Sequence, residues 1–260
     1  MKFMKKQIDF SKYSSIKIGS KIEVKVIDEI ISLPKGSFIV GGANNLLVSQ
    51  NPPSLYILSK KFDYIYLQKE HLIIGAATKS GRIFSFVKKY DINGFEYLGK
   101  LPGTLGGLVC MNAGMKEDEI FNNLVGIKTS KGYIEKEKIE YGYRYTDIDD
   151  IVYEAVFKIK RGFDVEKSQL FTKMRNKQPK EPSAGSVFKN PKDDFAGRLI
   201  ERVGLKGFRR GDAAFSEVHA NFLVNLGSAT YEEAIYLIKE AKRRVFESFG
   251  IILEEEIKIL

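Results

Sequence analysis

Residues 184–191 carry a hydroxyl, an amine and an amide close together, supplied by Ser186, Lys189 and Asn190. A serine in this setting can donate a proton to a reacting carbon or bind a ligand, and it can also be an ordinary turn residue. It is not the nucleophile of an α/β-hydrolase elbow, because that motif needs glycines two positions to either side of the serine. The segment therefore points to acid catalysis or ligand binding.

Two further groups carry charges that suit an anionic ligand or a developing charge. Arg144 follows Tyr143, and its planar guanidinium fits a carboxylate or a phosphate, although it can also be a plain surface arginine. Near residue 260, three glutamates at 254–256 precede Lys258. Side chains alternate along a strand, so Glu256 and Lys258 would share one face. Alternatively, these charged side chains are simply exposed to solvent and have no functional role.

The same alternation separates the three glutamates from one another. We predict a strand over residues 251–260, in which Glu254 and Glu256 share the face of Lys258. Glu255 would lie on the opposite face with its apolar neighbours. We therefore expect Glu256 to face any site at this position, with Glu254 and Glu255 as the alternatives for the acid.

Two segments, residues 37–48 and 101–114, are rich in glycine and other small residues. The second holds four glycines and no charge, in a chain of which 29% is charged. Glycine loses much backbone entropy on folding, so such a cluster needs a reason, and close approach of the backbone to a flat or phosphorylated ligand is one. Neither segment matches the common phosphate-loop or dinucleotide motifs. They indicate a nucleotide ligand or, alternatively, ordinary turns.

Metal and disulfide chemistry find little support in the sequence. His71 and His219 are far apart and lack cysteine or carboxylate partners at ligand spacing, so we predict no metal site. His219 opens a short apolar run and can be structural or a ligand contact. Cys110 is the only cysteine, which excludes an internal disulfide and suits a reducing compartment. Its apolar neighbours predict a buried side chain.

The composition is that of a globular protein with a basic surface. The chain has 260 residues and a net charge of +9, enough for one large domain or two to three small ones. The basic residues are scattered among acidic ones, which favours attraction of small polyanions such as nucleotides over nucleic-acid binding. No apolar run approaches the roughly 18 residues that span a bilayer, and the first residues form no secretory signal. We expect a cytoplasmic protein without membrane insertion.

The elements that must position these groups follow from hydrophobic periodicity. The first 160 residues predict mainly strands, at residues 21–28, 64–67, 72–74, 127–134 (a hairpin) and 150–160, with one helix at residues 80–90. Helices are then predicted at residues 168–176, 195–203 and 231–249. Asp193 or Asp194 would cap the second, and Thr230, Glu233 and Gly250 would delimit the third. The fold class is α+β, with a smaller second part from about residue 165.

In order along the chain, six segments resemble those of UDP-N-acetylenolpyruvoylglucosamine reductases, the flavoenzymes of peptidoglycan precursor synthesis. Residues 101–114, for example, are similar to the family's I-P-G-T-V-G-G-A-V-x-M-N-A-G. The other segments are residues 40–48, 143–146, 184–191, 197–207 with 216–225, and 250–258. One such match is weak, whereas six in order are specific. The length resembles the short form of the family.

The resemblance implies an FAD-binding fold of the vanillyl-alcohol-oxidase (PCMH) type. Residues 1–60 and 61–165 would form two α+β FAD-binding subdomains, residues 166–250 an α+β substrate-binding domain, and residues 251–260 a strand that contributes to the active site. It also implies reduction of FAD by NADPH, followed by hydride transfer to the β-carbon of the enolpyruvyl ether and protonation of the α-carbon. The product would be UDP-N-acetylmuramate. We expect a monomer whose partners are the UDP-sugar and NADPH.

Residue roles carry over from the family motifs. Arg144 and Glu256 would polarise the enolpyruvyl carboxylate, and Ser186 would protonate the α-carbon. The residues that match substrate contacts are Tyr143, Lys189, Asn190, His219 and Lys258. Those that match the FAD loops are Gly41, Gly42, Ala43, Asn44, Asn45, Leu46, Leu47, Pro102, Gly103, Thr104, Gly106, Gly107, Asn112, Ala113 and Gly114.

The sequence departs from the family pattern at several of these positions. Ala43 and Asn44 replace glycine and serine, Lys100 replaces glycine, Thr146 replaces serine, Glu255 replaces proline and Lys258 replaces arginine. None of these changes removes a required functional group. Two alternatives stay open, namely another flavin oxidoreductase of the same fold, such as an oxidase, and a basic nucleotide- or nucleic-acid-binding module without enzymatic activity.

Overall fold

The computed structural model describes residues 3–260 and divides the chain into two compact units, each assembled from separate stretches of sequence. The first unit comprises the described part of Met1–Lys6, Val24–Gly42 and Pro53–Arg175. The second comprises Gln7–Glu23, Ala43–Pro52 and Asn176–Leu260. Both units combine helices with strands, which confirms the α+β class. The finer division into two FAD-binding subdomains stays a prediction.

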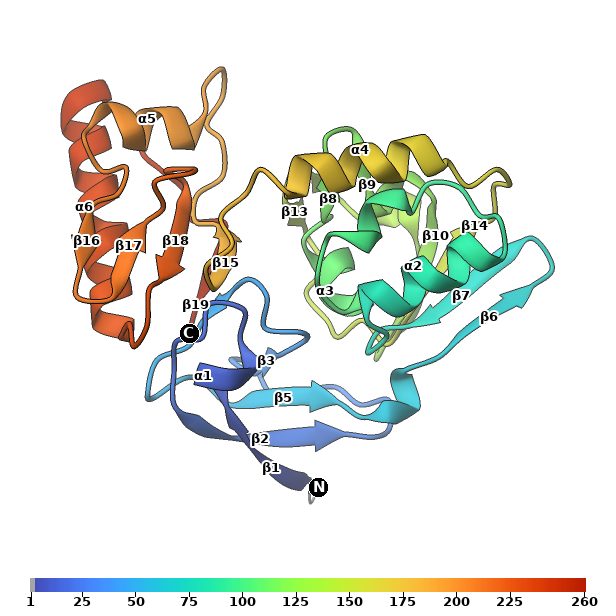
Figure 1. Cartoon of the computed structure of the whole chain (residues 1–260). Helices are drawn as coiled ribbons and strands as arrows, with labels where there is room; N and C mark the ends of the chain where they lie inside the picture. The colour runs from blue at the N-terminus through green and yellow to red at the C-terminus, as the bar shows by residue number, and fades with distance from the viewer. Residues whose placement is uncertain (1–2) are drawn as a thin grey trace. The chain divides into compact units, whose positions relative to one another are not determined.

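The first unit is organised around a five-stranded antiparallel sheet in the order β11-β10-β14-β7-β6 (Figure 1). Its strands are β6 (Ile65–Gln68), β7 (His71–Gly75), β10 (Leu124–Thr129), β11 (Gly132–Glu135) and β14 (Glu154–Lys158). The predicted hairpin at residues 127–134 is therefore confirmed, whereas the strand predicted over 150–160 is shorter.

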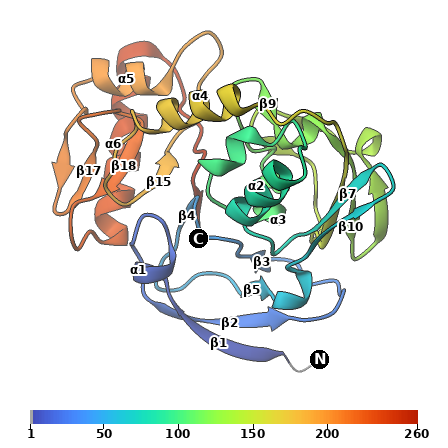
Figure 2. The same ribbon diagram turned by 45° about the vertical axis from the view of Figure 1, so that its right-hand side comes forward.

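Three helices accompany this sheet, namely α2 (Ser80–Lys89), α3 (Leu105–Cys110) and α4 (Val165–Arg175). Helices α2 and α3 lie on one face of the sheet (Figure 2), where Ile83 and Leu105 join the same buried cluster as Leu72, Ile74 and Ala155. Burial of such apolar side chains supplies about 25 cal/mol per Å² of area removed from water. This cluster is the main core of the first unit.

A second sheet of the first unit has the order β1-β2-β5-β3. Its strands are β1 (Met4–Asp9), β2 (Lys21–Ile27), β5 (Leu55–Leu58) and β3 (Phe38–Ile39), and β1 and β2 continue into residues assigned to the second unit. The remaining short elements are α1 (Phe10–Tyr13), β8 (Gly114–Met115), β9 (Asp118–Glu119), and the 3₁₀ turns η1 (Lys60–Phe62), η2 (Glu96–Gly99), η3 (Ile120–Asn122) and η4 (Lys136–Lys138).

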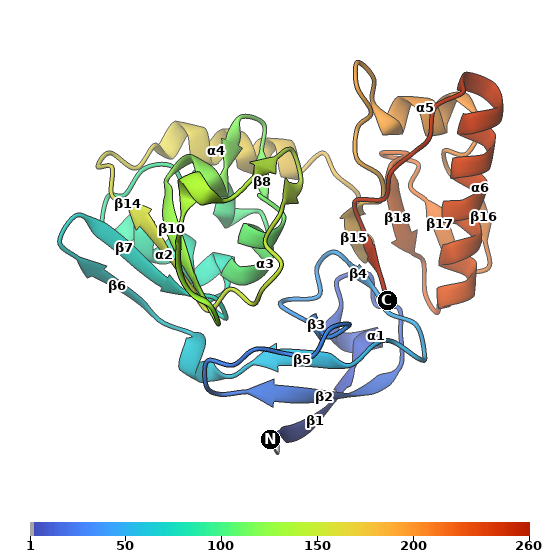
Figure 3. The ribbon, with the colours of Figure 1, turned by 180° about the vertical axis from the view of Figure 1, so that it is seen from behind.

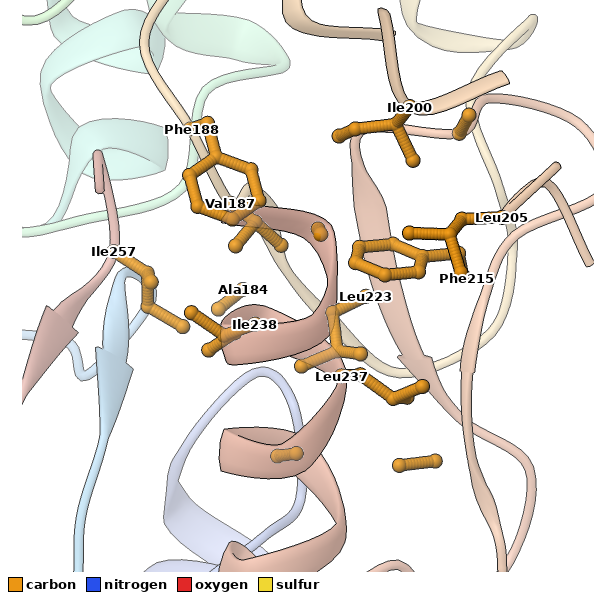
Figure 4. Close-up of a cluster of buried hydrophobic side chains, with 14 of the residues drawn as sticks. Ala184, Val187, Phe188, Ile200, Leu205, Phe215, Leu223, Leu237, Ile238 and Ile257 are labelled. Atoms are coloured by element: carbon orange, nitrogen blue, oxygen red, sulfur yellow. The ribbon is translucent and has the colours of Figure 1, made fainter. Parts of the chain in front are cut away.

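The second unit contains an antiparallel sheet in the order β15-β18-β17-β16. The strands are β15 (Ser183–Ser186), β16 (Arg209–Arg210), β17 (Ala213–Phe215) and β18 (Phe222–Asn225), and the helices are α5 (Ala196–Arg202) and α6 (Tyr231–Phe249). Helix α6 lies along this sheet (Figure 3). Figure 4 shows Leu223 of the sheet beside Leu237 of α6, inside the buried core of this unit.

Helix α6 confirms its predicted boundaries, because its ends are encoded locally. Thr230 accepts a hydrogen bond from the N–H of Glu233, and the Glu233 carboxylate accepts one from the N–H of Thr230. This capping box satisfies N–H groups that have no partner within the helix. Gly250 ends the helix with φ = 68°, a left-handed conformation that glycine adopts without penalty.

The predicted strand over residues 251–260 is wrong in extent. Only Lys258–Ile259 form a strand, β19, which pairs in parallel with β4 (Leu46–Leu47). The N–H groups of Glu256 and Ile257 both donate to the C=O of Val187, at 2.8 and 3.2 Å. Two consecutive donors on one acceptor break the regular ladder, so the preceding residues follow an irregular path.

Two other local predictions are also wrong. The N-cap of α5 is Phe195, whose side chain cannot cap, rather than Asp193 or Asp194. Cys110 is exposed rather than buried, because it lies on the face of α3 that does not enter the core. Among residues 3–260, no helix is both long and apolar enough to cross a bilayer.

Candidate functional site

The two glycine-rich segments approach each other inside the first unit. A Cβ atom added to Gly41 would lie 2.4 Å from Oγ1 of Thr104, which is much closer than two such atoms can approach. Glycine is therefore required where the first segment passes the second. Thr104 is the N-cap residue of α3, so the first segment passes the start of that helix. Gly41 thus has a structural reason to be glycine, because the Thr104 side chain occupies the space beside it.

Helix α3 has one buried face and one open face. The apolar residues that enter the core are Leu105, Leu108 and Val109. Gly107 and Cys110 lie one turn apart and are exposed. A Cβ atom at Gly107 would meet only Oγ1 of Thr104 within 4 Å, at 3.8 Å. The open face therefore has room for a flat group against the helix backbone.

Two N–H groups at the start of α3 serve the fold and are not available to a ligand. Leu105 donates to the C=O of Thr78 and Gly106 donates to the C=O of Ala76, both at 2.9 Å. A Cβ atom at Gly106 would lie 3.2 Å from Cβ of Ala76, so the absence of a side chain permits this packing. Gly106 thus has a structural reason to be glycine.

Asn112 is fully buried and has a left-handed backbone with φ = 42°. Its side-chain amide donates to Oε2 of Glu119 at 2.7 Å and to the C=O of Gly142 at 3.0 Å, and its Oδ1 accepts from the N–H of Phe121 at 3.3 Å. The polar atoms of this side chain therefore organise the protein itself. The next residues, Ala113 and Gly114, are buried as well.

Tyr143 and Arg144 form the turn of a small hairpin between β12 (Tyr141–Gly142) and β13 (Tyr145–Thr146). Arg144 has φ = 55°, which is unfavourable by roughly 1–2 kcal/mol for a residue other than glycine. Strained backbone of this kind accumulates where a side chain must be presented in a fixed direction. The exposed ring of Tyr143 lies 4.9 Å from the Arg144 guanidinium carbon, a cation–π contact.

Hydrogen-bond acceptors of the first unit hold the Arg144 side chain, which is only 18% exposed. Its Nη2 donates to the C=O of Gly114 at 3.0 Å, and its Nη1 lies 3.9 Å from Oε1 of Glu119. Glu119 in turn accepts from Asn112, so these three side chains form one network. Sequence reasoning missed Glu119, because nothing in the sequence distinguishes it from the neighbouring acidic residues.

Residues 43–47 of the first glycine-rich segment belong to the second unit. Ala43 has φ = 50°, which explains why glycine is usual there in similar sequences, and its C=O accepts from the N–H of Ser15 at 3.1 Å. The Asn44 amide donates to Oγ of Ser15 at 2.6 Å. The Asn45 amide donates to the C=O of Glu256 at 2.8 Å.

Ser186 is presented by a bulge in the second unit. Ser183 pairs with Val224 and Ser186 pairs with Phe222, so β15 carries one extra residue. Gly185, within the bulge, has φ = 84° and permits the left-handed turn. The Ser186 side chain is partly buried, and its hydroxyl makes no hydrogen bond to another residue of the described chain. Such a hydroxyl can donate its proton to a ligand.

Asn221 fixes the backbone that follows Ser186. Its side chain donates to the C=O of Phe188 at 2.8 Å and accepts from the N–H of Phe188 at 3.0 Å, as a neighbouring strand would. Its own C=O accepts from the N–H of Val187 at 2.8 Å. The C=O of Val187 in turn accepts from the N–H of Glu256. The backbone at Val187, which we call the Val187 peptide frame, therefore fixes both the residue after Ser186 and the backbone of Glu256. Sequence reasoning assigned Asn221 no role.

The three glutamates have different surroundings in the second unit. Glu254 forms an ion pair with Lys189 at 2.6 Å, and Glu255 forms one with Lys242 of α6 at 2.7 Å. Glu255 therefore points toward α6, on the side where Leu253 and Ile257 are buried. Glu256 is half-buried beside the Val187 peptide frame. This arrangement supports the predicted register, although the regular strand is absent.

Further candidates in the second unit are held by their own neighbours. Oδ1 of Asn190 accepts from the N–H of Ala196 at 3.1 Å and so acts as the missing side-chain cap of α5. Lys189 is bound to Glu254 through both its side chain and its N–H. Lys258 is exposed on β19, and its N–H donates to the C=O of Asn45 at 3.0 Å.

His219 offers a single donor nitrogen. Its Nδ1 accepts from the N–H of Asn221 at 3.2 Å, which places the proton of the neutral ring on Nε2. Its ring packs against Phe222 and Gly197. Partial loss of hydration lowers the pKa of His219, and the nearby charge of Lys206 adds to this effect. Near neutral pH the ring is therefore a neutral donor.

The predicted site residues fall into two groups. Tyr143 and Arg144 belong to the first unit, with Gly41, Gly42 and the whole second glycine-rich segment. Ser186, Lys189, Asn190, His219, Glu256 and Lys258 belong to the second, with residues 43–47. Within the second unit, backbone hydrogen bonds join Glu256 to Val187, the residue after Ser186. The roles of all these residues stay predictions.

Comparison with known proteins gives consistent matches over the whole chain. Residues 178–260 match the family model described as UDP-N-acetylenolpyruvoylglucosamine reductase, C-terminal domain. The protein of that name from Campylobacter jejuni (strain RM1221) is 49% identical over 258 residues, covering 97% of this chain and 99% of the relative. The protein of that name from Helicobacter hepaticus is 50% identical over 257 residues, covering 97% and 98%.

A solved structure is similar as well. The crystal structure of UDP-N-acetylenolpyruvylglucosamine reductase from Thermus caldophilus superposes with a TM-score of 0.84 at 28% identity. The match covers 99% of this chain and 99% of that one. The similarity therefore extends over both units.

Proposed function

The chain belongs to the family of UDP-N-acetylenolpyruvoylglucosamine reductases and is an oxidoreductase, and we propose that it reduces UDP-N-acetyl-enolpyruvoylglucosamine to UDP-N-acetylmuramate. NADPH would be the reductant and FAD the cofactor, in the synthesis of peptidoglycan precursors. The observation that carries this proposal is the backbone hydrogen bond from Glu256 to Val187, the residue after Ser186, which brings together the two chain segments that would supply the proton donor and the acid. The reaction needs both groups.

The proposed FAD-binding fold is of the vanillyl-alcohol-oxidase (PCMH) type. The residues fit a dinucleotide that lies against backbone, because the Gly107 face of α3 is open and has no side chain in the way. Gly42, Thr104 and Gly107 would hold FAD in the first unit, and residues 43–47 would do so in the second. When bound, FAD would carry a hydride from NADPH to the β-carbon of the enolpyruvyl ether.

The side chains of the protein would supply charge and a proton to this reaction. Hydride addition places negative charge on the enolpyruvyl carboxylate, so a cation and an acidic donor lower the barrier. Arg144 has the required charge and a fixed orientation, and Glu256 would act as a protonated donor. Ser186 would protonate the α-carbon, which completes reduction of the double bond to the lactyl group.

The remaining polar residues would bind the UDP-sugar. Lys189 and Lys258 carry positive charge suited to a diphosphate, and His219 offers Nε2–H as a neutral donor. Asn190 keeps its amide NH₂ group available while its Oδ1 caps α5. Tyr143 is an exposed ring next to Arg144. We expect the reaction to take place in the cytoplasm, with the protein acting as a monomer.

Membership of a reductase family disfavours the alternative of a nucleotide- or nucleic-acid-binding module without enzymatic activity. A flavin oxidase of the same fold differs in its reaction, and one assay separates the two. We expect purified protein to be yellow with non-covalent FAD and to oxidise NADPH only when the UDP-enolpyruvyl sugar is present. Colourless protein that takes up no FAD, or NADPH oxidation indifferent to the sugar, would overturn the proposal.

A further inference from the structure

Asn45 contacts the backbone of the predicted acid from both its side chain and its main chain. Its Nδ2 donates to the C=O of Glu256 at 2.8 Å, and its own C=O accepts from the N–H of Lys258 at 3.0 Å. We propose that Asn45 is a positioning residue for Glu256, in addition to its place in the glycine-rich loop. This inference rests on the function proposed above.

The irregular path of the chain before β19 makes this contact necessary. In a regular strand the ladder would fix the direction of every side chain, but here only Lys258–Ile259 form a strand. On one side, the N–H of Glu256 donates to the C=O of Val187 at 2.8 Å. On the other side, Asn45 takes the place of a strand partner for the C=O of Glu256. The two contacts together fix the two peptide planes on either side of the Glu256 Cα, and so set the direction in which its side chain leaves the backbone.

The neighbouring asparagine does something different. Asn44 donates to Oγ of Ser15 at 2.6 Å, and the N–H of Ser15 donates to the C=O of Ala43. That pair of contacts ties the loop to the residues after α1 and does not involve Glu256. The two adjacent side chains therefore have different functions: Asn44 anchors the loop, and Asn45 places Glu256.

This arrangement couples the loop predicted to hold FAD to the group that acts on the substrate. Removing one hydrogen bond to a partly buried carbonyl typically changes an equilibrium by about tenfold. We therefore expect Asn45→Ala to slow substrate-dependent reoxidation of the flavin about tenfold in the protein that has FAD bound, in addition to any effect on FAD binding, which is measured separately. The KM for the sugar should change much less than kcat.

The experiment compares Asn45→Ala with Ser15→Ala, a control that releases the neighbouring amide and leaves the contact to Glu256 intact. Both full-length proteins are first assayed for bound FAD and for thermal unfolding. Hydrogen exchange is then measured without flavin, and we expect faster exchange of the backbone amides at residues 256–260 in Asn45→Ala only. Asn45→Ser provides a second variant if the alanine variant does not fold.

A double-mutant cycle with Glu256→Gln tests whether Asn45 acts through that acid. We expect Asn45→Ala to add almost nothing in the Glu256→Gln background, because the group it positions is already inactive. Full additivity of the two substitutions in FAD-loaded protein would overturn the inference. If the wild type shows no sugar-dependent turnover, the proposed function fails, whereas unchanged exchange at residues 256–260 in Asn45→Ala refutes the positioning contact itself.

Discussion

Arg144 and Glu256 differ in the contacts that place them, which involve the side chain of Arg144 and the backbone of Glu256. Arg144 is fixed through its side chain, by the C=O of Gly114 and the carboxylate of Glu119, above a turn with φ = 55°. Glu256 is fixed through its backbone, by Val187 and Asn45. The orientation of Arg144 therefore depends on partners of its side chain, whereas the position of Glu256 depends on the backbone around Val187 and on Asn45.

The largest expected effect on the reaction rate comes from removing the Ser186 hydroxyl while the backbone around Val187 stays intact. Ser186→Ala keeps the bulge at Gly185 and the hydrogen bonds of Val187, so the fold should be unchanged. Loss of a general acid typically costs about 10²–10⁴ in rate. We expect that loss in sugar-dependent flavin reoxidation, measured by stopped flow, with flavin reduction by NADPH nearly intact. An equal loss in both steps would assign Ser186 to the fold or the flavin site.

The next effect distinguishes the acid from its neighbour. Glu256→Gln retains the backbone contacts and removes the acidic proton, so we expect turnover to fall by about 10²–10³ with FAD still bound. Glu255→Gln removes only the ion pair with Lys242, which is partly exposed, and should change turnover less than about threefold. A severe Glu255→Gln with a benign Glu256→Gln would show that the register is displaced by one residue.

A smaller effect should follow from loosening the Arg144 side chain. Glu119→Gln removes the negative charge beside Nη1 while Asn112 can still donate to the new amide oxygen. A lost charge-assisted contact should lower sugar-dependent turnover by about tenfold. Glu117→Gln, at an exposed position two residues earlier, is the matched control and should behave as the wild type. Identical kinetics for both variants would mean that the charge of Glu119 is not needed to orient Arg144.

The smallest effect concerns the pH dependence contributed by His219. The fold lowers the pKa of this ring, so the unfolded chain binds a proton at a higher pH than the folded chain does. Stability is therefore complete above the unfolded pKa and declines as the pH falls through it toward the lowered value. The ring is largely exposed, which limits the effect to below about 1 kcal/mol. Urea unfolding at pH 7 and pH 5 should show a larger loss for wild type than for His219→Gln, whereas parallel losses would contradict the assignment.

Elements with local signals could be predicted from the sequence, and elements held by distant contacts could not. The ends of α6 follow from Thr230, Glu233 and Gly250, all within or next to the helix. Helix α3 was missed because two of its six residues are glycine, and burial of its apolar face overrides their weak propensity. The extent of the strand over residues 251–260 was overestimated because β4 offers only two residues to pair with, and the residues before β19 contact Val187 and Phe188 irregularly.

The candidate site shows the same limit. The types of Ser186, Arg144 and Glu256 could be recognised from their motifs, but the contacts that orient them could not. Asn45 and Glu256 are 211 positions apart, and no periodicity relates them. Asn190 illustrates the opposite error, because a side chain predicted only to bind substrate also caps α5. Long-range hydrogen bonds depend on the folded backbone and leave no local pattern.

The parallel pairing of β4 with β19 has a consequence for biosynthesis. During translation, residues 43–49 leave the ribosome long before residues 256–260, which supply their hydrogen-bond partners. The hydrophobic core of the second unit also includes three early residues, Ile16, Ile18 and Leu47. The other residues of this core all lie after residue 183, so these side chains cannot be buried there until that part of the chain has been made. The early segments must therefore stay unpaired until residues 256–260 have been synthesised. Nascent chains of this protein should depend on protection of these apolar stretches more than chains whose domains are contiguous in sequence.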